Sequence, residues 1–182
     1  TITSRVTGGS SLTAVGDISI EAADATTVVM VAGGFAASSQ AAVGAALSTV
    51  YVGSTILAGI DASDVTSTGG AVSLTAGIEP PAETDPSSLP LGVSGLDMPS
   101  ATSSGIVSVT VGGAASGKNA GGLGISVNVV ENDLEASITG GSDVSALTGV
   151  TLSAVDASVI DALAFGGAGA GLVGATAPAA DV

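Results

Sequence analysis

Acidic side chains are the residues of this sequence whose type and spacing could do chemistry. The chain has 182 residues, with 16 Asp and Glu against two Lys and Arg, and it contains neither His nor Cys. Without His the commonest general base and transition-metal ligand are missing, and without Cys there are no thiolate metal sites, thiol nucleophiles or disulfides. Any site must therefore be built from carboxylates, hydroxyls, amides and backbone groups.

One acidic cluster has the composition of a calcium ligand set. Glu131, Asn132 and Asp133 are consecutive, Glu135 follows them, and the cluster is expected at a turn. Ca²⁺ binds about six to eight oxygens from carboxylates, amide side chains and turn carbonyls. The sequence has no EF-hand loop and no glycine–aspartate nonapeptide repeat. Two interpretations stay open: solvated turn carboxylates, which are the more common case, or a calcium site formed by Glu131, Asn132 and Asp133. Calcium is the one cofactor that the sequence suggests, and we expect that none is required.

Enzymatic motifs lack their context. Residues 169–174 read Gly-Ala-Gly-Leu-Val-Gly, which matches the glycine fingerprint of dinucleotide-binding folds, but that fingerprint needs a following helix and a later acidic residue. Paired carboxylates also serve glycosidases, whose sugar sites usually add aromatic and basic side chains. This chain has one Tyr, two Phe and no Trp. We therefore expect no enzymatic activity.

Charge excludes two classes of partner. With a net charge of −14 the chain cannot neutralise phosphates, so we expect no nucleic-acid binding, and anionic membrane surfaces would repel it. Residues 26–60 carry no charge, but Ser, Gln and Gly interrupt them and no Lys or Arg flanks them. We therefore expect no membrane insertion.

Strands must position these side chains. Hydrophobic residues make up 46% of the chain, yet only 2% are aromatic and 28 residues are Gly. Val, Ile and Thr favour strands, and abundant Gly disfavours long helices. Apolar and polar residues alternate in segments 18–22, 125–129 and 150–154, which is typical of half-buried strands. Paired glycines such as Gly8-Gly9 and Gly140-Gly141 suit sharp turns.

A sequence pattern recurs at a fixed spacing. Similar segments start at Val6, Ile60 and Ile138, and twelve residues after each start comes a strand-like run, at 18–22, 72–76 and 150–154. The spacing from Ile18 to Val72 is 54 residues, whereas that from Val72 to Val150 is 78. The excess is assigned to an insertion at 78–101, which holds five of the six prolines and should loop out of the sheets.

The sequence therefore predicts an all-β fold: a parallel β-helix or β-solenoid of about three 54-residue repeats with one Pro-rich inserted loop. The predicted single segment, 1–182, divides into repeats 1–54, 55–132 (with the inserted loop 78–101) and a partial 133–182. From usual strand and turn lengths, each repeat would make about two to three coils. The runs 28–43, 106–122 and 162–175, rich in Ala and Gly, are either strands of closely spaced sheets or glycine loops at the corners.

Three segments carry a family resemblance. Residues 121–138, Val150–Ala154 and Ala162–Ala170 resemble the repeats of giant secreted adhesins of Gram-negative bacteria and cyanobacteria, the filamentous-haemagglutinin-like proteins. The resemblance covers nearly the whole chain except 78–101, and it rests on pattern and composition rather than on an invariant motif. It implies a secreted or cell-surface location in a bacterium, a β-helical shaft, and a role in adhesion, biofilm or surface matrix.

The same resemblance implies no catalytic residues. The expected partners are neighbouring repeats or other copies of the chain, together with a host or matrix surface. A second interpretation makes the chain a subunit of a self-assembling extracellular filament or sheath, because an uncapped solenoid exposes strand edges.

Overall fold

The computed structural model describes residues 1–78, 105–170, 173–176 and 180–181. The predicted inserted loop 78–101 lies outside these residues, apart from its first residue, Ile78. Among the described residues no helix has the length and apolarity needed to cross a membrane. The regular elements are the strands β1 (Ile2–Val6), β2 (Ser11–Ala14), β3 (Ile18–Asp24), β4 (Thr27–Ser38), β5 (Ala41–Asp61), β6 (Asp64–Ser67), β7 (Ala71–Ile78), β8 (Gly105–Ser116), β9 (Asn119–Thr139), β10 (Asp143–Ala146), β11 (Gly149–Asp156), β12 (Val159–Ala170), β13 (Val173–Thr176) and β14 (Ala180–Asp181).

Each strand pairs in parallel with its equivalent in the next repeat. Ile18 of β3 lies opposite Val72 of β7, and Val72 lies opposite Val150 of β11. The sheets have the orders β2-β6-β10, β3-β7-β11, β4-β8-β12 and β1-β5-β9-β13, with β14 also on β9. The chain therefore makes three passages, β1–β4, β5–β8 and β9–β12, and each passage adds one strand to each sheet. The prediction of an all-β fold with parallel strands is confirmed.

One repeat makes a single passage, so the expectation of two to three coils per repeat is wrong. The reason is strand length, since β5 and β9 have 21 residues each, about four times the usual strand. The register also locates the extra residues. Ile18 and Val72 are 54 positions apart, whereas Thr27 and its partner Gly105 are 78 apart, so 24 more residues lie between Ile78 and Gly105 than in the first passage.

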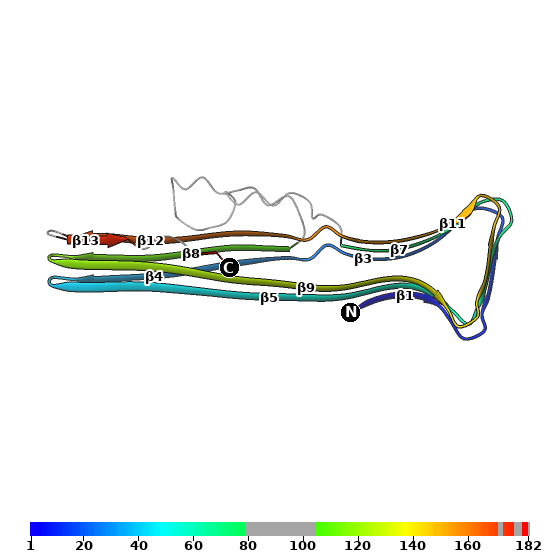
Figure 1. Cartoon of the computed structure of the whole chain (residues 1–182), viewed down its shortest axis with the longest axis horizontal. Coiled ribbons are helices and arrows are strands. Elements are labelled where there is room, and N and C mark those ends of the chain that lie inside the picture. Colours follow the sequence, from blue (N-terminus) through cyan, green and yellow to red (C-terminus); the bar gives the residue numbers. More distant parts are fainter. Residues whose placement is uncertain (79–104, 171–172, 177–179, 182) are drawn as a thin grey trace. The chain divides into compact units, whose positions relative to one another are not determined.

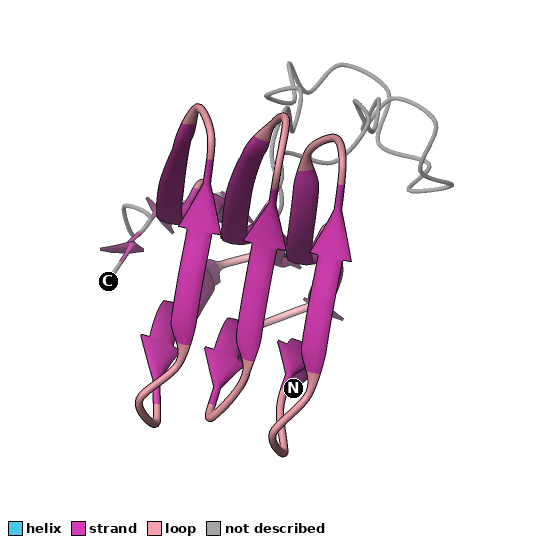
Figure 2. Ribbon diagram, turned by 90° about the vertical axis from the view of Figure 1, so that its right-hand side faces the viewer, coloured by secondary structure: helices cyan, strands magenta, loops and turns pink. Residues whose placement is uncertain are grey.

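Among the described residues, the first compact unit consists of 1–26, 53–78 and 131–158. Its three passages lie side by side with their turns in line (Figure 2). Alternation places Ile18 and Ile20 inside and Ser19 and Glu21 outside. Inward side chains from three sheets form one aliphatic core, whose buried members are Ile18, Ile20, Ala22, Ile56, Ala58, Ile60, Val65, Val72, Leu74, Ala76 and Ile78.

Among the described residues, the second compact unit consists of 27–52, 105–130, 159–170, 173–176 and 180–181. In it β4, β8 and β12 run together as one sheet (Figure 1). A Cβ atom on Gly44 would collide with the carbonyl oxygen of Gly113, and one on Gly112 with that of Leu123. Around these glycines the two layers therefore approach to backbone contact, and the buried cluster there consists of small side chains, Ala42, Ala114 and Ala120. Where the structure describes them, the runs rich in Ala and Gly are thus strands of closely spaced sheets and not glycine loops.

Candidate functional site

The predicted calcium cluster lies within a strand, not at a turn. Strand β9 continues through Glu131, Asn132 and Asp133 as far as Thr139. Side chains alternate sides along a strand, and Glu131 and Asp133 are exposed whereas Asn132 is half-buried. The structure therefore brings the two carboxylates to one side and turns Asn132 to the other. No group of three acidic side chains suited to a metal ion occurs among the described residues, and the calcium site stays a prediction that rests on Glu131 and Asp133.

The side chain of Asn132 makes hydrogen bonds that join two strands. Its Nδ2 donates to Asp156 Oδ2 at 3.0 Å and to Ser158 Oγ at 2.8 Å. The same carboxylate closes a turn after β11, where Asp156 Oδ1 accepts the N–H of Ser158 at 2.9 Å. Burial alone would raise the pKa of Asp156, but the hydrogen bonds from Ser158 and Asn132 outweigh it and lower the pKa. Asn132 thereby ties β9 to the end of β11.

Asp24 forms the equivalent cluster in the first passage. Asp24 Oδ1 accepts the Thr26 hydroxyl at 2.6 Å and the Thr26 N–H at 3.0 Å, and Oδ2 accepts the Ser54 hydroxyl at 2.8 Å. The hydrogen bond from Thr26 lowers the pKa of Asp24, burial opposes it, and the bond from Ser54 adds to the lowering. In register, Asp24 and Asp156 flank Ile78, which has no polar side chain.

The missed functional residues carry a short signal. Asp24-Ala-Thr26 and Asp156-Ala-Ser158 share the pattern Asp-Ala followed by a hydroxyl residue, which is typical of a carboxylate that caps its own turn. In the second passage this pattern is replaced by Ile78, the residue at which the register offset changes from 54 to 78. At this position of the fold, the first and third passages therefore have the capped turn, and the second passage has the 24 extra residues.

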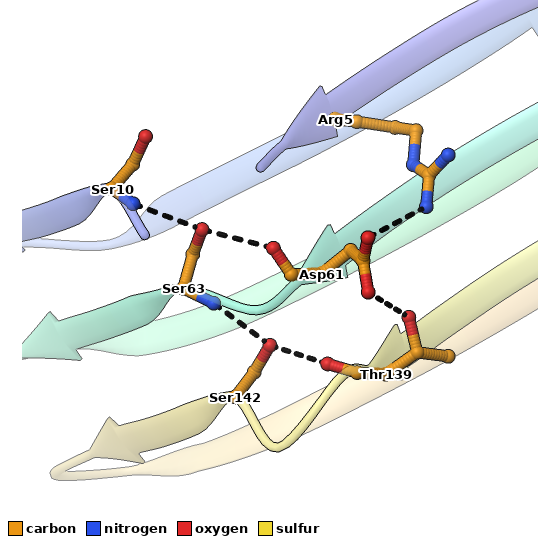
Figure 3. A network of polar contacts seen from close by, with 6 residues as sticks. All are labelled: Arg5, Ser10, Asp61, Ser63, Thr139 and Ser142. Atoms are coloured by element: carbon orange, nitrogen blue, oxygen red, sulfur yellow. Dashed lines mark hydrogen bonds and ion pairs between the residues drawn. The ribbon is translucent and has the colours of Figure 1, made fainter. Parts of the chain in front are cut away.

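A second polar cluster is formed by the turns that follow β1, β5 and β9 (Figure 3). A serine hydroxyl closes each turn by donating to a carbonyl oxygen two or three residues earlier. These bonds run from Ser10 to Thr7 at 2.6 Å, from Ser63 to Asp61 at 3.0 Å and from Ser142 to Thr139 at 2.6 Å.

The three serines also form a ladder between passages. The backbone N–H of Ser10 donates to Ser63 Oγ at 3.2 Å, and the N–H of Ser63 donates to Ser142 Oγ at 3.2 Å. The hydroxyls of Ser63 and Ser142 therefore each accept from the preceding passage while they donate within their own turns. The N–H of Ser142 instead bonds to Thr139 O, at 3.3 Å. In both bonds of the ladder the N–H donor belongs to the earlier passage and the hydroxyl acceptor to the later one.

Asp61 connects the turn after β5 to a residue of β9 and to a residue of β1. Its Oδ1 accepts the Thr139 hydroxyl at 2.9 Å, and its Oδ2 lies 3.8 Å from Arg5 Nη2. Both side chains of the ion pair are more than a third exposed, so the pair contributes little to stability. The middle turn is one residue shorter than its neighbours and places Ala62 at φ 47°, a conformation that costs about 1 kcal/mol or more for a residue with a Cβ.

The hydrogen bonds of both clusters hold the turns and strands of the fold in place. Their carboxylates and hydroxyls are engaged in closing turns and in joining neighbouring passages, as the bonds of Asp24, Asp156 and Ser63 show. The arrangement gives every passage a serine-closed turn, gives the first and third passages a carboxylate cap as well, and holds adjacent passages in register. Comparison of the chain with protein-family models, with curated proteins and with solved structures found no match.

Proposed function

We propose that this chain is a section of a β-solenoid shaft in a secreted bacterial surface protein that acts in adhesion or in a biofilm or surface matrix. The proposal rests on the register of the paired strands. Ile18, Val72 and Val150 occupy one position in three successive passages. A further copy of the repeat can pair with the last one through the same backbone bonds, so the architecture can be lengthened without a new kind of contact.

Several properties suit a shaft. Each added passage would lengthen the stack by about 4.8 Å, the spacing of hydrogen-bonded strands. Neighbouring passages stabilise each other, so disulfides are not needed, and a net charge of −14 keeps a β-rich surface soluble. The resemblance to giant secreted adhesins points to the same role. Along the shaft the partners are neighbouring repeats, and the protein as a whole meets a host or matrix surface without catalysis.

The location tests this function. Antibodies raised against the chain should label intact cells of the bacterium that makes it, or its extracellular matrix. Removing the segment in frame should weaken attachment of the cells while export of the remaining protein continues. Labelling that appears only after the cells are permeabilised would refute the proposal.

A second candidate is a subunit of a self-assembling extracellular filament or sheath. The observation that favours it is that β2 and β10 are the edge strands of their sheet, and edge strands are templates for further pairing. Electron microscopy of the purified 182-residue chain separates the two candidates. Long polymers support the filament, and dispersed particles support the shaft.

A further inference from the structure

We infer that one outer face of the second compact unit binds the same face of a second copy of this chain, so that two stacks lie side by side. This apolar face consists of the outward side chains of residues 43–51 in β5 and 123–129 in β9, which are neighbours in one sheet (Figure 1). The inference rests on the fold and not on the proposed function. A contact between two like faces closes after two copies, so it joins two shafts along their sides and lengthens neither.

The two strand segments alternate buried and outward residues. Every second residue is buried from Ala42 to Val50 in β5 and from Ala120 to Asn128 in β9, and the residues between them point to the outer side of the sheet. A sheet with one side in water usually has polar side chains on that side. Here none of the outward residues of the apolar face is charged, and Thr49 is the only one that is neither aliphatic nor aromatic.

The side chains of the apolar face are open to solvent. Val43, Leu47 and Tyr51 are 77%, 65% and 64% exposed, and Leu123 and Val129 are 37% and 44% exposed. Strand β9 has β5 on one side and β13 and β14 on the other, so the face does not arise from the ends of the chain. Further passages would pair beside these strands in the same sheet, and they would widen the face without covering it.

The exposed area suits a weak dimer. From their exposed fractions these five side chains present about 500 Å² to solvent, the size of the largest apolar patch on a typical monomer, which is often functional. Two such faces in contact would bury about 1,000 Å², the lower limit for a specific interface. Sheets pack face to face at about 10 Å through side chains of this kind. A second copy therefore supplies both the flat shape and the apolar area that the face requires.

The apolar face lies in a part of the chain with little charge. The charged residues described in the second compact unit are Lys118, Asp161 and Asp181, whereas the whole chain has a net charge of −14. Two copies can therefore meet through this face without bringing rows of carboxylates together. The repulsion expected between two acidic chains does not oppose a contact at this place.

Charge also indicates the orientation of the two copies. Beyond Val129 the outward row of β9 continues with Glu131 and Asp133, and at the other end of the strand the exposed Lys118 precedes its first residue. Lys118 and the two carboxylates lie at similar distances from Ile125, on opposite sides of it. When the strands of the two copies run in opposite directions, Lys118 of each copy lies near the carboxylates of the other, so the ends of the face are complementary.

The single tyrosine reports directly on this face. Tyr51 is the only Tyr and the chain has no Trp, so the intrinsic fluorescence of the unmodified chain comes from the apolar face. Sedimentation velocity at about 150 mM salt, where the Debye length is about 8 Å, should show dimers and nothing larger as the concentration rises from micromolar to millimolar. Over the same range the quenching of Tyr51 by acrylamide should fall at least about twofold, because the contact removes the ring from solvent.

A charge in the middle of the face tests the contact, with a matched control outside it. Leu47→Glu should lower the association constant at least about tenfold, since a carboxylate would have to be buried against the second copy. Val15→Glu introduces the same charge at a side chain that is 81% exposed in the turn between β2 and β3, and it should leave association unchanged. A mixture of Leu47→Glu with Leu47→Lys should associate more strongly than either variant alone, because opposite charges then meet.

The inference is overturned if the unmodified chain stays monomeric at millimolar concentration, if acrylamide quenches Tyr51 equally in the oligomer, or if Leu47→Glu and Val15→Glu weaken association equally. A monomer whose Tyr51 is protected at every concentration would show that a segment of the same chain covers the face instead. The quenching measurement uses the unmodified chain, so it decides the matter even if circular dichroism shows that a variant does not fold. A monomeric chain that still labels intact cells would leave the shaft proposal standing, whereas dimers of a chain confined to the cell interior would refute only the shaft.

Discussion

Ser108 and Ser126 lie with their hydroxyl oxygens 2.7 Å apart inside the second compact unit, and both side chains are completely buried. Ser48 lies 2.9 Å from Ser108, and Asn128 Nδ2 donates to Ser126 at 2.9 Å. This chain of hydrogen bonds connects β8 with β5 and β9. Because buried polar groups are costly without partners, the network favours the one alignment of the two layers in which these hydroxyls meet.

Replacing the central hydroxyl should destabilise the fold. Ser108→Ala leaves the hydroxyls of Ser48 and Ser126 without this partner, and we expect the free energy of unfolding to fall by about 1–3 kcal/mol. Urea denaturation measures the change. Ser11→Ala, at an exposed position of β2, should change it by less than about 0.5 kcal/mol. Equal effects of the two substitutions would mean that the network contributes no stability.

Two adjacent glycines provide a matched test of the close layers. A Cβ on Gly122 would collide with the carbonyl oxygen of Gly167, whereas a Cβ on Gly121 meets nothing within 4 Å. Gly122→Ala should therefore lower the free energy of unfolding by about 1–3 kcal/mol, the usual cost of overpacking. Gly121→Ala should be neutral or slightly stabilising, because it restricts the unfolded chain. Denaturant midpoints that do not differ between the variants would contradict the backbone-to-backbone spacing.

The strand class and register were predictable from sequence because they depend on local alternation and on repeated spacing. Ile18, Val72 and Val150 are each followed by the same alternation, and their spacing is the spacing of the paired strands. The number of passages per repeat was not predictable, because it depends on strand length. Glycines such as Gly44 and Gly112 let the facing layers approach and so allow long strands without breaks, whereas the sequence left open whether the runs rich in Ala and Gly are strands or corner loops.

The acidic cluster shows a different limit of sequence reasoning. Glu131, Asn132 and Asp133 resemble a polar turn, but β9 runs through them. Their side chains diverge because a strand alternates sides. The clusters around Asp24 and Asp156 were missed since their partners, Ser54 and Asn132, are 30 and 24 residues away and come from another sheet. Such contacts follow from the fold and not from local pattern.

Acid should destabilise the chain through Asp156. Its pKa is lowered in the folded state, so the stability that it contributes is fully present above the unfolded value of about 3.9 and is lost as the pH falls through the folded pKa. Asp156→Asn should remove this contribution. The difference in urea midpoint between the unmodified chain and the variant should therefore be largest above about pH 4 and shrink at lower pH. Adding Ser158→Ala to the variant should add no further pH dependence, and a difference that grows toward low pH would contradict the assignment.

The calcium site predicted at Glu131 and Asp133 should bind the ion weakly. Glu131 and Asp133 share one side of β9, and two carboxylates supply fewer oxygens than the ion takes, so we expect a Kd of about 10⁻⁴–10⁻³ M, the weak end of protein calcium sites. Isothermal titration calorimetry on the chain and on Asp133→Asn measures the affinity and its loss. Asn132→Ala should retain calcium binding but lower the melting temperature, because it removes the bonds to Asp156 and Ser158. If the chain releases no heat with calcium and melts at the same temperature with calcium and with a chelator, the prediction of a calcium site at Glu131 and Asp133 is wrong.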